Sequence, residues 1–287
     1  GQENSGSSRR GELLPPRSLE EIVTEFFWSL RLSFSQGFDQ QPTMLQPVGG
    51  MDRIVRAFEA KVSSDLVVNA RVTEIRKADA GVRVVYEDRA GAPVSVEADY
   101  GIVTIPAPVL AGIANDFSPE HRAEINGFRY SSAVRVAFQA PRFWESEHNI
   151  FGGITWTDQD VTQIWYPNHG FLEPNGIVIG AYVFDGAAGD AFARLAPSDR
   201  LTRTLDQAAA VHPELPAQAE RGISVAWQKV PFQLGGWGTS AASVLLRADD
   251  DFHFAGEHLS ILQGWQEGAI LSAYAAIDGI VARDQNA

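Results

Sequence analysis

The sequence predicts an α+β protein that contains α/β elements, and three observations support this class. Short β-branched runs separated by turn residues begin at Leu66, where helical spacing gives way to strand spacing. A second strand-rich region runs from Ala133 to Phe184. The chain closes with a short apolar strand and a long helical pattern over about 264–283. Of its 287 residues 45% are apolar, which is enough for a sizeable core.

The first part of the chain predicts a flexible segment followed by helices. Residues 1–17 are polar and rich in glycine, serine and proline, without an initiator methionine or an apolar signal core, and we expect them to be flexible. Ser18-Leu-Glu-Glu21 has the capping-box pattern and predicts a helix over about 18–36. A glycine-rich turn at 46–52 leads into a second predicted helix, about 51–61.

Short runs between residues 71 and 105 predict strands separated by turns. They cover about 71–77, 82–88, 94–98 and 100–105. The last run is continuously apolar up to Pro106, as expected of a buried central strand. Short helices are expected at about 109–114 and after Ser118, where Pro119 suits a first helical position.

The second strand-rich region predicts an antiparallel sheet, because its strands follow one another without intervening helices. The expected strands are about 133–139, 150–156, 162–167 and 177–184. Beyond them we expect helices at about 188–195 and 198–211, a strand at 222–228, a loop at 235–238, a strand at 252–255 and the last helix.

Composition excludes several classes of protein and site. The chain has 36 acidic and 23 basic residues. The resulting net charge of −13 argues against nucleic acid or an anionic membrane as partner. No apolar run approaches the 20 residues of a membrane-spanning helix. The absence of cysteine excludes disulfides and thiolate zinc sites; it is compatible with secretion or a periplasmic location, and the location is left open.

The histidines and the acidic run near the C-terminus are expected to be structural or solvated. The six histidines have no metal-ligand spacing, so no metal site is predicted. We expect His121, His148 and His212 to be exposed and Asp249-Asp250-Asp251 to form a solvated turn.

The most informative segment is Phe252 to Ala269, which reads FHFAGEHLSILQGWQEGA. A short strand ends in Ala-Gly-Glu257, and a helix begins near Gly264-Trp265-Gln266. Glycine lets the backbone approach a ligand closely, and a helix N-terminus directs free N–H groups at negative charge. These features indicate a site for a polyhydroxylated, anionic cofactor beside an aromatic wall, with an ordinary strand–loop–helix as the alternative.

This segment resembles the C-terminal flavin motif of the flavin-dependent amine oxidase family, and other short blocks agree with the family's order. They are Pro47-Val-Gly-Gly-Met-Asp52, Val72-Thr-Glu-Ile75, Ala98 to Ala107, Phe143-Trp144-Glu145 and Tyr166-Pro-Asn-His169. The last two resemble the substrate domain of L-amino acid oxidases. The resemblance covers the chain from about residue 20 to its end and implies the C-terminal part of a two-domain fold, with FAD-domain strands and a mixed-sheet substrate domain flanked by helices.

The resemblance also implies a division of the chain into domains. A helical segment at 18–45 leads to the FAD-binding part at 46–107, and the substrate-binding domain covers 108–230. A substrate-pocket loop and the C-terminal FAD-binding segment make up 231–287.

The dinucleotide fingerprint that the family carries on its first strand–helix turn is absent in its expected form. The one near match, Gly236-Trp-Gly238-Thr-Ser-Ala241, opens no clear helix and fits a loop beside the substrate pocket better. We therefore expect a separate N-terminal chain to carry the fingerprint, with Arg9-Arg10 as a candidate processing site, and a homodimer of processed protomers.

Several cofactor contacts are implied by the resemblance. Val72 would contact the adenine, Trp227 the pyrimidine side of the flavin, Glu257 the ribityl or diphosphate region and the Gln266 backbone the N1/C2=O edge. The full implied FAD set is Val72, Trp227, Gly256, Glu257, Gly264, Trp265, Gln266 and Ala269.

On the substrate side, the resemblance implies that Tyr182 binds the amino acid carboxylate, with a core tyrosine as the alternative. The Gly264 carbonyl would accept from the substrate amine. Trp265 would wall the site beside the flavin, and Trp237, together with Phe232, would favour an apolar or aromatic side chain, with ordinary packing as the alternative for Trp237. Arg135 stands nearest the place of a lysine that holds a catalytic water in many members; either it fills that role or the lysine is missing.

The implied activity is FAD-dependent oxidation of an L-amino acid by O₂ to the 2-oxo acid, ammonia and hydrogen peroxide, with Arg135 and Trp265 as catalytic residues. A flavin amino acid 2-monooxygenase and a polyamine or monoamine oxidase remain alternatives within the family. A stabilising or regulatory subunit without catalysis is the alternative outside it.

Overall fold

The computed structural model describes most of the chain in two compact units, residues 1–66 and 67–287. The described residues are 2–3, 12–13, 15–24, 34, 37, 40, 44–184, 186–240 and 242–285. Each unit is considered by itself.

The described residues of the first unit form two small strands and two helices. They are β1 (Gln2–Glu3), β2 (Glu12–Leu13), α1 (Leu19–Thr24) and α2 (Asp52–Val62), and β1 pairs with β2 antiparallel. The Ser18 hydroxyl accepts a hydrogen bond from the Glu21 amide at 3.1 Å, so the predicted capping pattern is confirmed. The helix expected over 18–36 is observed to Thr24, and residues 25–33 lie outside the described part.

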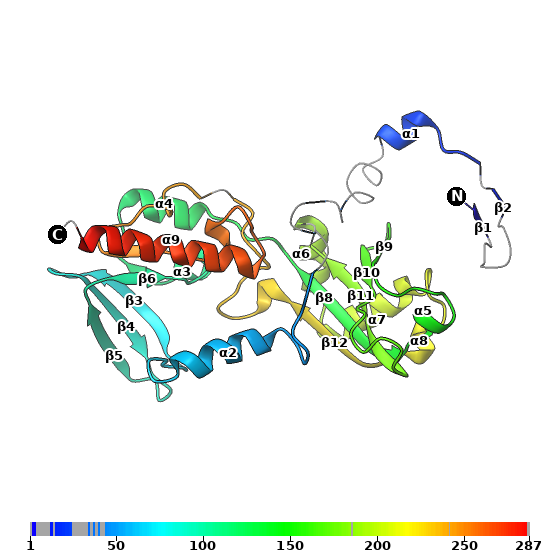
Figure 1. Cartoon of the computed structure of the whole chain (residues 1–287), viewed down its shortest axis with the longest axis horizontal. Coiled ribbons are helices and arrows are strands. Elements are labelled where there is room, and N and C mark those ends of the chain that lie inside the picture. Colours follow the sequence, from blue (N-terminus) through cyan, green and yellow to red (C-terminus); the bar gives the residue numbers. More distant parts are fainter. Residues whose placement is uncertain are drawn as a thin grey trace. The chain divides into compact units, whose positions relative to one another are not determined.

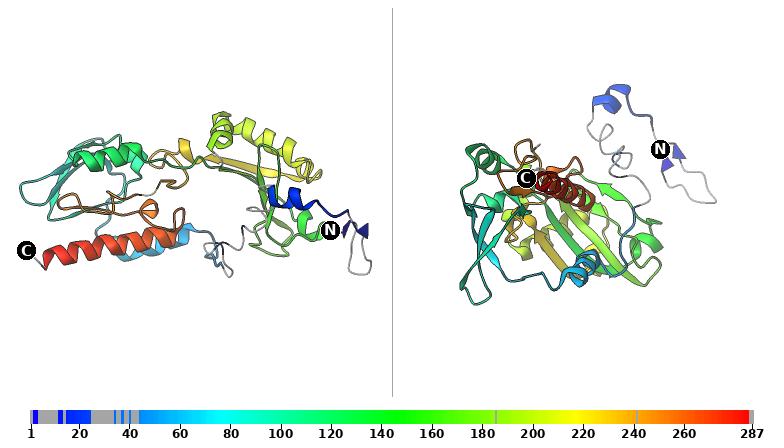
Figure 2. Two further views of the ribbon diagram at one scale, coloured as in Figure 1. Left: turned by 90° about the horizontal axis from the view of Figure 1, so that it is seen from above. Right: turned by 60° about the vertical axis from the view of Figure 1, so that its left-hand side comes forward.

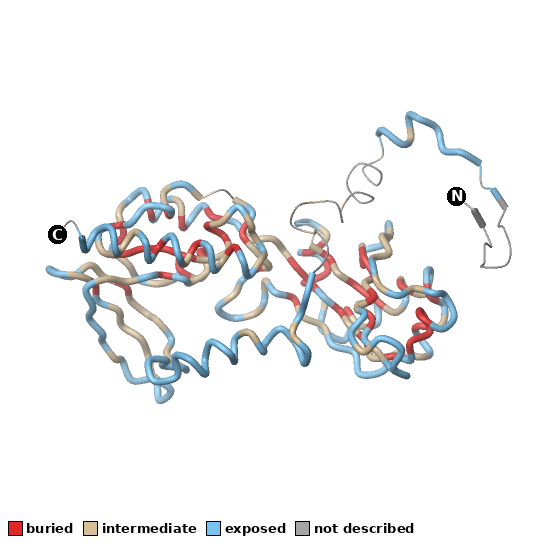
Figure 3. Tube along the Cα trace, viewed as in Figure 1, coloured by how far each residue is buried: buried red, intermediate tan, exposed pale blue. Residues whose placement is uncertain are grey.

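Helix α2 agrees with the helix expected at 51–61 and buries none of its residues, as its colour in Figure 3 shows. Its apolar side chains are exposed instead, among them Val55 at 64% and Phe58 at 58%. No helix in the described ranges combines the length and the apolar content needed to cross a bilayer.

In the second unit, a four-stranded sheet and a two-stranded parallel pair make up the first lobe (Figure 1). The sheet has the order β5-β4-β3-β7, from β3 (Arg71–Lys77), β4 (Val82–Glu87), β5 (Pro93–Ala98) and β7 (Ala114–Asn115). The parallel pair is β6 (Gly101–Val103) with β13 (Phe252–Phe254). The helices are α3 (Ala107–Leu110), α4 (Pro119–Gly127) and α9 (Gln266–Asp284), and a 3₁₀ turn, η5 (Glu257–Leu259), follows β13.

Aromatic side chains hold this lobe together across distant parts of the sequence. The ring of Phe117 meets the rings of Phe252 and Phe254 edge to face, with centroids 5.3 Å apart in both cases. The imidazole of His121 stacks on Phe254. Strand β13, 150 residues beyond β6 in sequence, is thereby fixed to the core that covers β6 on one side.

One expectation for this lobe is wrong. The run at 100–105 was expected to form a central strand buried on both faces, but Ile102 is 39% exposed. Among the described residues, β6 and β13 pair only with each other, so the parallel sheet has two open edges. Parallel sheets are rarely left in this state, because both their faces and their edges need cover.

The second lobe is a five-stranded antiparallel sheet of order β12-β8-β11-β10-β9, which confirms the predicted arrangement. Its strands are β8 (Val134–Pro141), β9 (Ile154–Trp156), β10 (Gln163–Trp165), β11 (Asn175–Val183) and β12 (Glu220–Ala226). Its helices are α5 (Phe143–Ser146), α6 (Gly186–Arg194), α7 (Pro197–Ala208) and α8 (Leu215–Gln218). Helix α7 packs on β8, β11 and β12, and the left view of Figure 2 shows the yellow-green helices of this lobe along one side of the sheet.

Three polar groups expected at the surface are buried. His121 is 5% exposed and His212 is 2% exposed, whereas His148 is exposed as expected. Asp249 is 6% exposed; it accepts hydrogen bonds from the Lys77 ammonium at 2.8 Å and from the Ser118 amide at 2.7 Å. The acidic run therefore contains an anchor between β3 and the start of α4, which neighbouring sequence alone does not reveal.

A buried ion pair at the edge of the antiparallel sheet provides a test of the second lobe. Arg142 and Glu145 are each 6% exposed and are joined at 2.5 Å; Arg142 also donates to the Asn175 carbonyl and Glu145 accepts from the Leu172 amide. Because Glu145→Ala leaves the guanidinium buried without its counter-charge, we expect it to lower the free energy of unfolding by about 3–5 kcal/mol in urea titrations.

The matched control is Glu120→Ala, which removes the partner of Arg247 from a pair whose side chains are 69% and 64% exposed. It should change the free energy of unfolding by less than about 1 kcal/mol. Equal effects of the two substitutions would contradict the role assigned to burial.

A second prediction concerns pH. Burial lowers the pKa of His258 from 6.5 to about 4, since the ring packs between Phe128 and Tyr130. Between these two pH values the unfolded chain binds the proton and the folded chain does not, so the stability from the neutral ring is complete above pH 6.5 and is lost as pH falls towards 4. The loss amounts to roughly 3 kcal/mol.

Urea unfolding at pH 7 and at pH 4.5 measures this loss. His258→Gln should reduce the difference between the free energies of unfolding at these two pH values. Burial lowers the pKa of His212 and His253 as well, and these groups act equally in both proteins. The same pH dependence with and without His258 would refute the prediction.

Candidate functional site

The loop after β13 and the loop that carries Trp237 are joined by one carboxylate. Glu257 Oε1 accepts a hydrogen bond from the Gly238 amide at 3.0 Å, and Oε2 accepts one from the Gly264 amide at 2.7 Å. Gly264 has φ of +80°, which favours glycine, and a Cβ there would lie 3.4 Å from Trp237 Cγ. The two loops are thus held in contact, with Trp237 against the turn that precedes α9.

A row of aromatic side chains continues from Trp237 into the antiparallel sheet. The ring centroids of Trp237 and Phe184 are 5.8 Å apart, and those of Phe184 and Tyr182 are 5.2 Å apart. The guanidinium of Arg135 sits 4.2 Å from the centre of the Tyr182 ring, and the two residues are directly paired between β8 and β11. We call Arg135, Tyr182, Phe184 and Trp237 the aromatic row.

The aromatic row brings together residues that the sequence predicts separately. Arg135, Tyr182, Trp237 and Gly264, expected on the substrate side, form one continuous chain of contacts. Phe184, which connects Tyr182 to Trp237, was not predicted; its alternation with Tyr182 at the end of β11 gave no distinctive signal.

Helix α9 begins where the sequence predicts and presents its N-terminus beside this row. Trp265 is the N-cap residue with extended backbone, and no side chain caps the helix. Gln266 is exposed, and Gly256, Trp265 and Ala269 are partly exposed. The N–H groups of the first turn therefore lack a side-chain acceptor, and the helix end favours negative charge.

Val72 lies apart from the aromatic row, in a cavity of about 990 Å³. Its walls come from β3, from the Thr104–Pro106 segment after β6 and from Gly112 and Phe232. Phe232 was expected with Trp237 in the substrate pocket, but it lines this cavity instead. The volume and the mainly apolar walls suit a heteroaromatic part of a cofactor such as adenine.

Trp227 is 37% exposed and begins a 3₁₀ turn, Trp227–Lys229, rather than continuing strand β12 as expected. Its amide donates to the Ala133 carbonyl at 2.9 Å, which fixes the turn at the start of β8. An exposed indole at this junction is available for contact with a planar ligand.

The segment Gly236–Gly238 is a loop edge and not a phosphate cradle. The Gly236 amide donates to the Ser131 carbonyl, and the Ser131 amide donates to the Trp237 carbonyl, both at 2.8 Å. No helix begins within residues 239–251, of which all but 241 are described. The interpretation of this glycine pattern as a pocket loop agrees with this geometry.

Tyr130 is a further residue of this region that the sequence did not reveal. Burial and the charge of Glu257 raise the pKa of the Tyr130 phenol. Tyr130 also bridges to Gly238, so it supports the same loop that Glu257 holds. Glu257 thereby has protein partners at both oxygens before any cofactor binds.

Comparison with known proteins points to one family. Residues 11–280 match the family described as flavin-containing amine oxidoreductase. The flavin-dependent L-tryptophan oxidase RebO of Lentzea aerocolonigenes is 28% identical over 260 residues, which are 86% of this chain and 54% of the relative. The L-amino-acid oxidase of Mus musculus is 29% identical over 245 residues, 80% of this chain and 38% of the relative. The chain thus spans about half the length of the curated relatives it matches.

Solved structures show the same fold. Putrescine oxidase bound to putrescine superposes with a TM-score of 0.68 at 17% identity, covering 82% of this chain and 53% of that one. Cyclohexylamine oxidase from Brevibacterium oxydans gives 0.67 at 18% identity, over 83% and 53%. With the family match across nearly the whole sequence, the chain belongs to the flavin-containing amine oxidoreductases.

Proposed function

We propose that the chain forms the substrate-binding face and part of the cofactor-binding face of an FAD-dependent L-amino acid oxidase. The reaction would convert an L-amino acid, water and O₂ to the 2-oxo acid, ammonia and hydrogen peroxide. The observation that carries the proposal is the aromatic row, which links Arg135 and Tyr182 to Trp237 and, through the Glu257 loops, to the N-terminus of α9. The L-amino acid oxidases among the relatives support it.

On the substrate side, Tyr182 would donate its phenol hydrogen to the substrate carboxylate. The Gly264 carbonyl would accept from the amine, and Trp237 and Trp265 would cover the side chain and exclude water. A tyrosine pressed against a guanidinium has few rotamers left, so the hydroxyl would be held before substrate arrives.

FAD is the cofactor of this family. When bound, it would supply the acceptor for the hydride from the substrate Cα and the route by which both electrons reach O₂. The residues fit this group in two respects: the cavity beside Val72 suits its adenine, and the uncapped start of α9 at Gln266 suits negative charge on its flavin. Trp227, Gly256 and Ala269 would line its remaining surface.

Glu257 and Arg135 have more than one candidate role. Both Glu257 oxygens already accept backbone amides, so contact with a ribityl hydroxyl would use their remaining lone pairs. Arg135 would hold Tyr182 in place, and its role in orienting a catalytic water remains a prediction.

The open edges of the β6–β13 pair support a further part of the proposal. Additional parallel strands with a dinucleotide fingerprint would complete this sheet, and a separate N-terminal chain would be their source. The processed protomers would assemble as a dimer.

Anaerobic flavin bleaching tests the function. The protein, purified together with the proposed N-terminal chain and mixed without oxygen with each L-amino acid in turn, should be yellow, lose this absorbance with at least one amino acid and release one 2-oxo acid per flavin. Bleaching by putrescine or spermidine alone would favour an amine oxidase. A carboxamide product on readmission of O₂ would indicate a 2-monooxygenase, and a colourless protein a non-catalytic subunit.

Tyr182→Phe tests the carboxylate contact in the same assay. A hydrogen bond to a charged group contributes about 1.5–3 kcal/mol, so we expect the substrate concentration for half-maximal bleaching to rise by roughly 10- to 100-fold. Tyr274→Phe, on a 63% exposed residue of α9, is the matched control and should leave it unchanged. An unaltered concentration in Tyr182→Phe would remove Tyr182 from the substrate site.

A further inference from the structure

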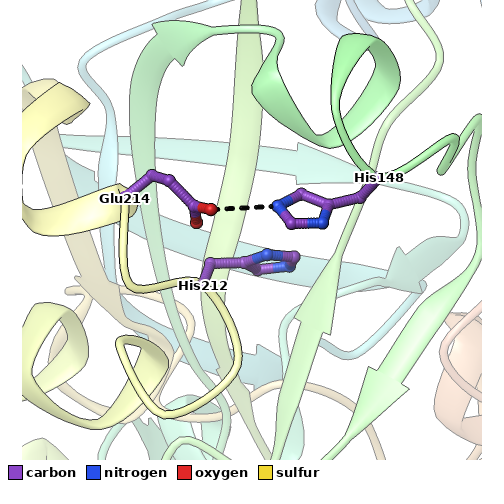
Figure 4. A group of neighbouring side chains, drawn as sticks. All are labelled: His148, His212 and Glu214. Atoms are coloured by element: carbon purple, nitrogen blue, oxygen red, sulfur yellow. Dashed lines mark hydrogen bonds and ion pairs between the residues drawn. The ribbon is translucent and has the colours of Figure 1, made fainter. Parts of the chain in front are cut away.

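A group of three metal-ligand side chains lies in the second lobe, apart from every residue proposed to contact flavin or substrate. His148 lies in the turn after α5, and His212 and Glu214 lie between α7 and α8. One ligand atom from each lies within 4.8 Å of the other two. Figure 4 shows the His212 imidazole beside the His148–Glu214 pair, whose nearest atoms, Nε2 and Oε1, are 3.2 Å apart.

Two polar atoms of these residues are buried without a hydrogen-bond partner among the described residues. His212 is 2% exposed, and its Nδ1 has no hydrogen-bond partner; the same is true of the buried Glu214 Oε2. An unpaired buried nitrogen and an unpaired buried carboxylate oxygen are costly, and a cation bound by the group would lower this cost.

The orientation of His212 is fixed by the hydrogen bonds of its other nitrogen. Nε2 lies 2.6 Å from the Tyr166 hydroxyl, which in turn lies 2.8 Å from the Thr155 hydroxyl. If Nε2 donates to Tyr166 and Tyr166 donates to Thr155, Nδ1 is left with a free lone pair. Metal-binding histidines are commonly held by such a second hydrogen bond.

Apolar packing encloses the group on one side. The ring of Phe143 meets the imidazoles of His148 and His212 edge to face, with centroids 6.1 and 5.4 Å apart.

From this geometry we propose that His148, His212 and Glu214 form a site for a divalent transition cation with nitrogen and oxygen ligands, of which Zn²⁺ is the representative. Two imidazoles and one carboxylate are a common zinc set, and water would complete a tetrahedron. Ligand atoms around Zn²⁺ are about 3.4 Å apart, given bonds of about 2.0–2.1 Å. Small rotations of His148 and Glu214, whose side chains are 35% and 28% exposed, would close the present spacing. The site would tie the turn after α5 to the α7–α8 connection.

The test is a titration of the full chain with Zn²⁺ against a chromophoric zinc chelator, together with thermal unfolding with and without the metal. We expect one site per chain and a rise in Tm on binding. His148→Ala and Glu214→Gln, which change partly exposed side chains, should each weaken the affinity at least tenfold and abolish the rise in Tm. His169→Ala, an exposed histidine in a turn of the same lobe, should do neither.

Co²⁺ gives an independent readout, because four-coordinate Co²⁺ absorbs visible light far more strongly than the hydrated ion. We expect this absorption in the unaltered chain and in His169→Ala, and its loss in the two ligand variants, whose folding circular dichroism would verify. No stoichiometric binding, or binding of equal affinity in all four proteins, would overturn the proposal. Oxidase activity plays no part in the test, so its outcome is independent of the proposed function.

Discussion

The carboxylate of Glu257 is the interaction on which the candidate site depends. Each of its oxygens accepts a hydrogen bond from the amide of a glycine, Gly238 on one loop and Gly264 on the other. A charged acceptor forms stronger hydrogen bonds than a neutral one, so the two loops are fixed relative to each other. The positions of Trp237 and of the start of α9 follow from this one side chain.

The two lobes of the second unit contribute unequally to the site. The antiparallel sheet is closed by hydrogen bonds along β8, β11 and β12, and it carries Arg135 and Tyr182 in register. The first lobe offers a parallel pair with open edges, a cavity beside Val72 and an uncapped helix. Under the proposed function, the side that would bind the substrate is preorganised within the chain, whereas the side that would bind the cofactor has backbone groups without partners among the described residues.

Much of the fold could be predicted from sequence, because local patterns determined it. The strand runs at 133–139 and 177–184 predicted β8 and β11, and Pro119 after Ser118 predicted the start of α4. Tyr182 and Arg135 were predicted individually, from a resemblance. Their contact depends on register, which a single sequence does not encode locally.

What could not be predicted depends on residues that meet only after folding. His148 and His212 are 64 positions apart, and no spacing rule for metal ligands connects them. The ion pair of Lys77 and Asp249 likewise joins residues that are far apart in sequence. Ile102 is a different case. Its apolar run correctly predicted a strand, but the predicted burial of that strand is wrong at Ile102. The cover is what the described residues lack, and an apolar strand exposed at a parallel edge costs free energy until another strand adds to it. If further strands complete this sheet, as proposed above, the burial of Ile102 would report it directly.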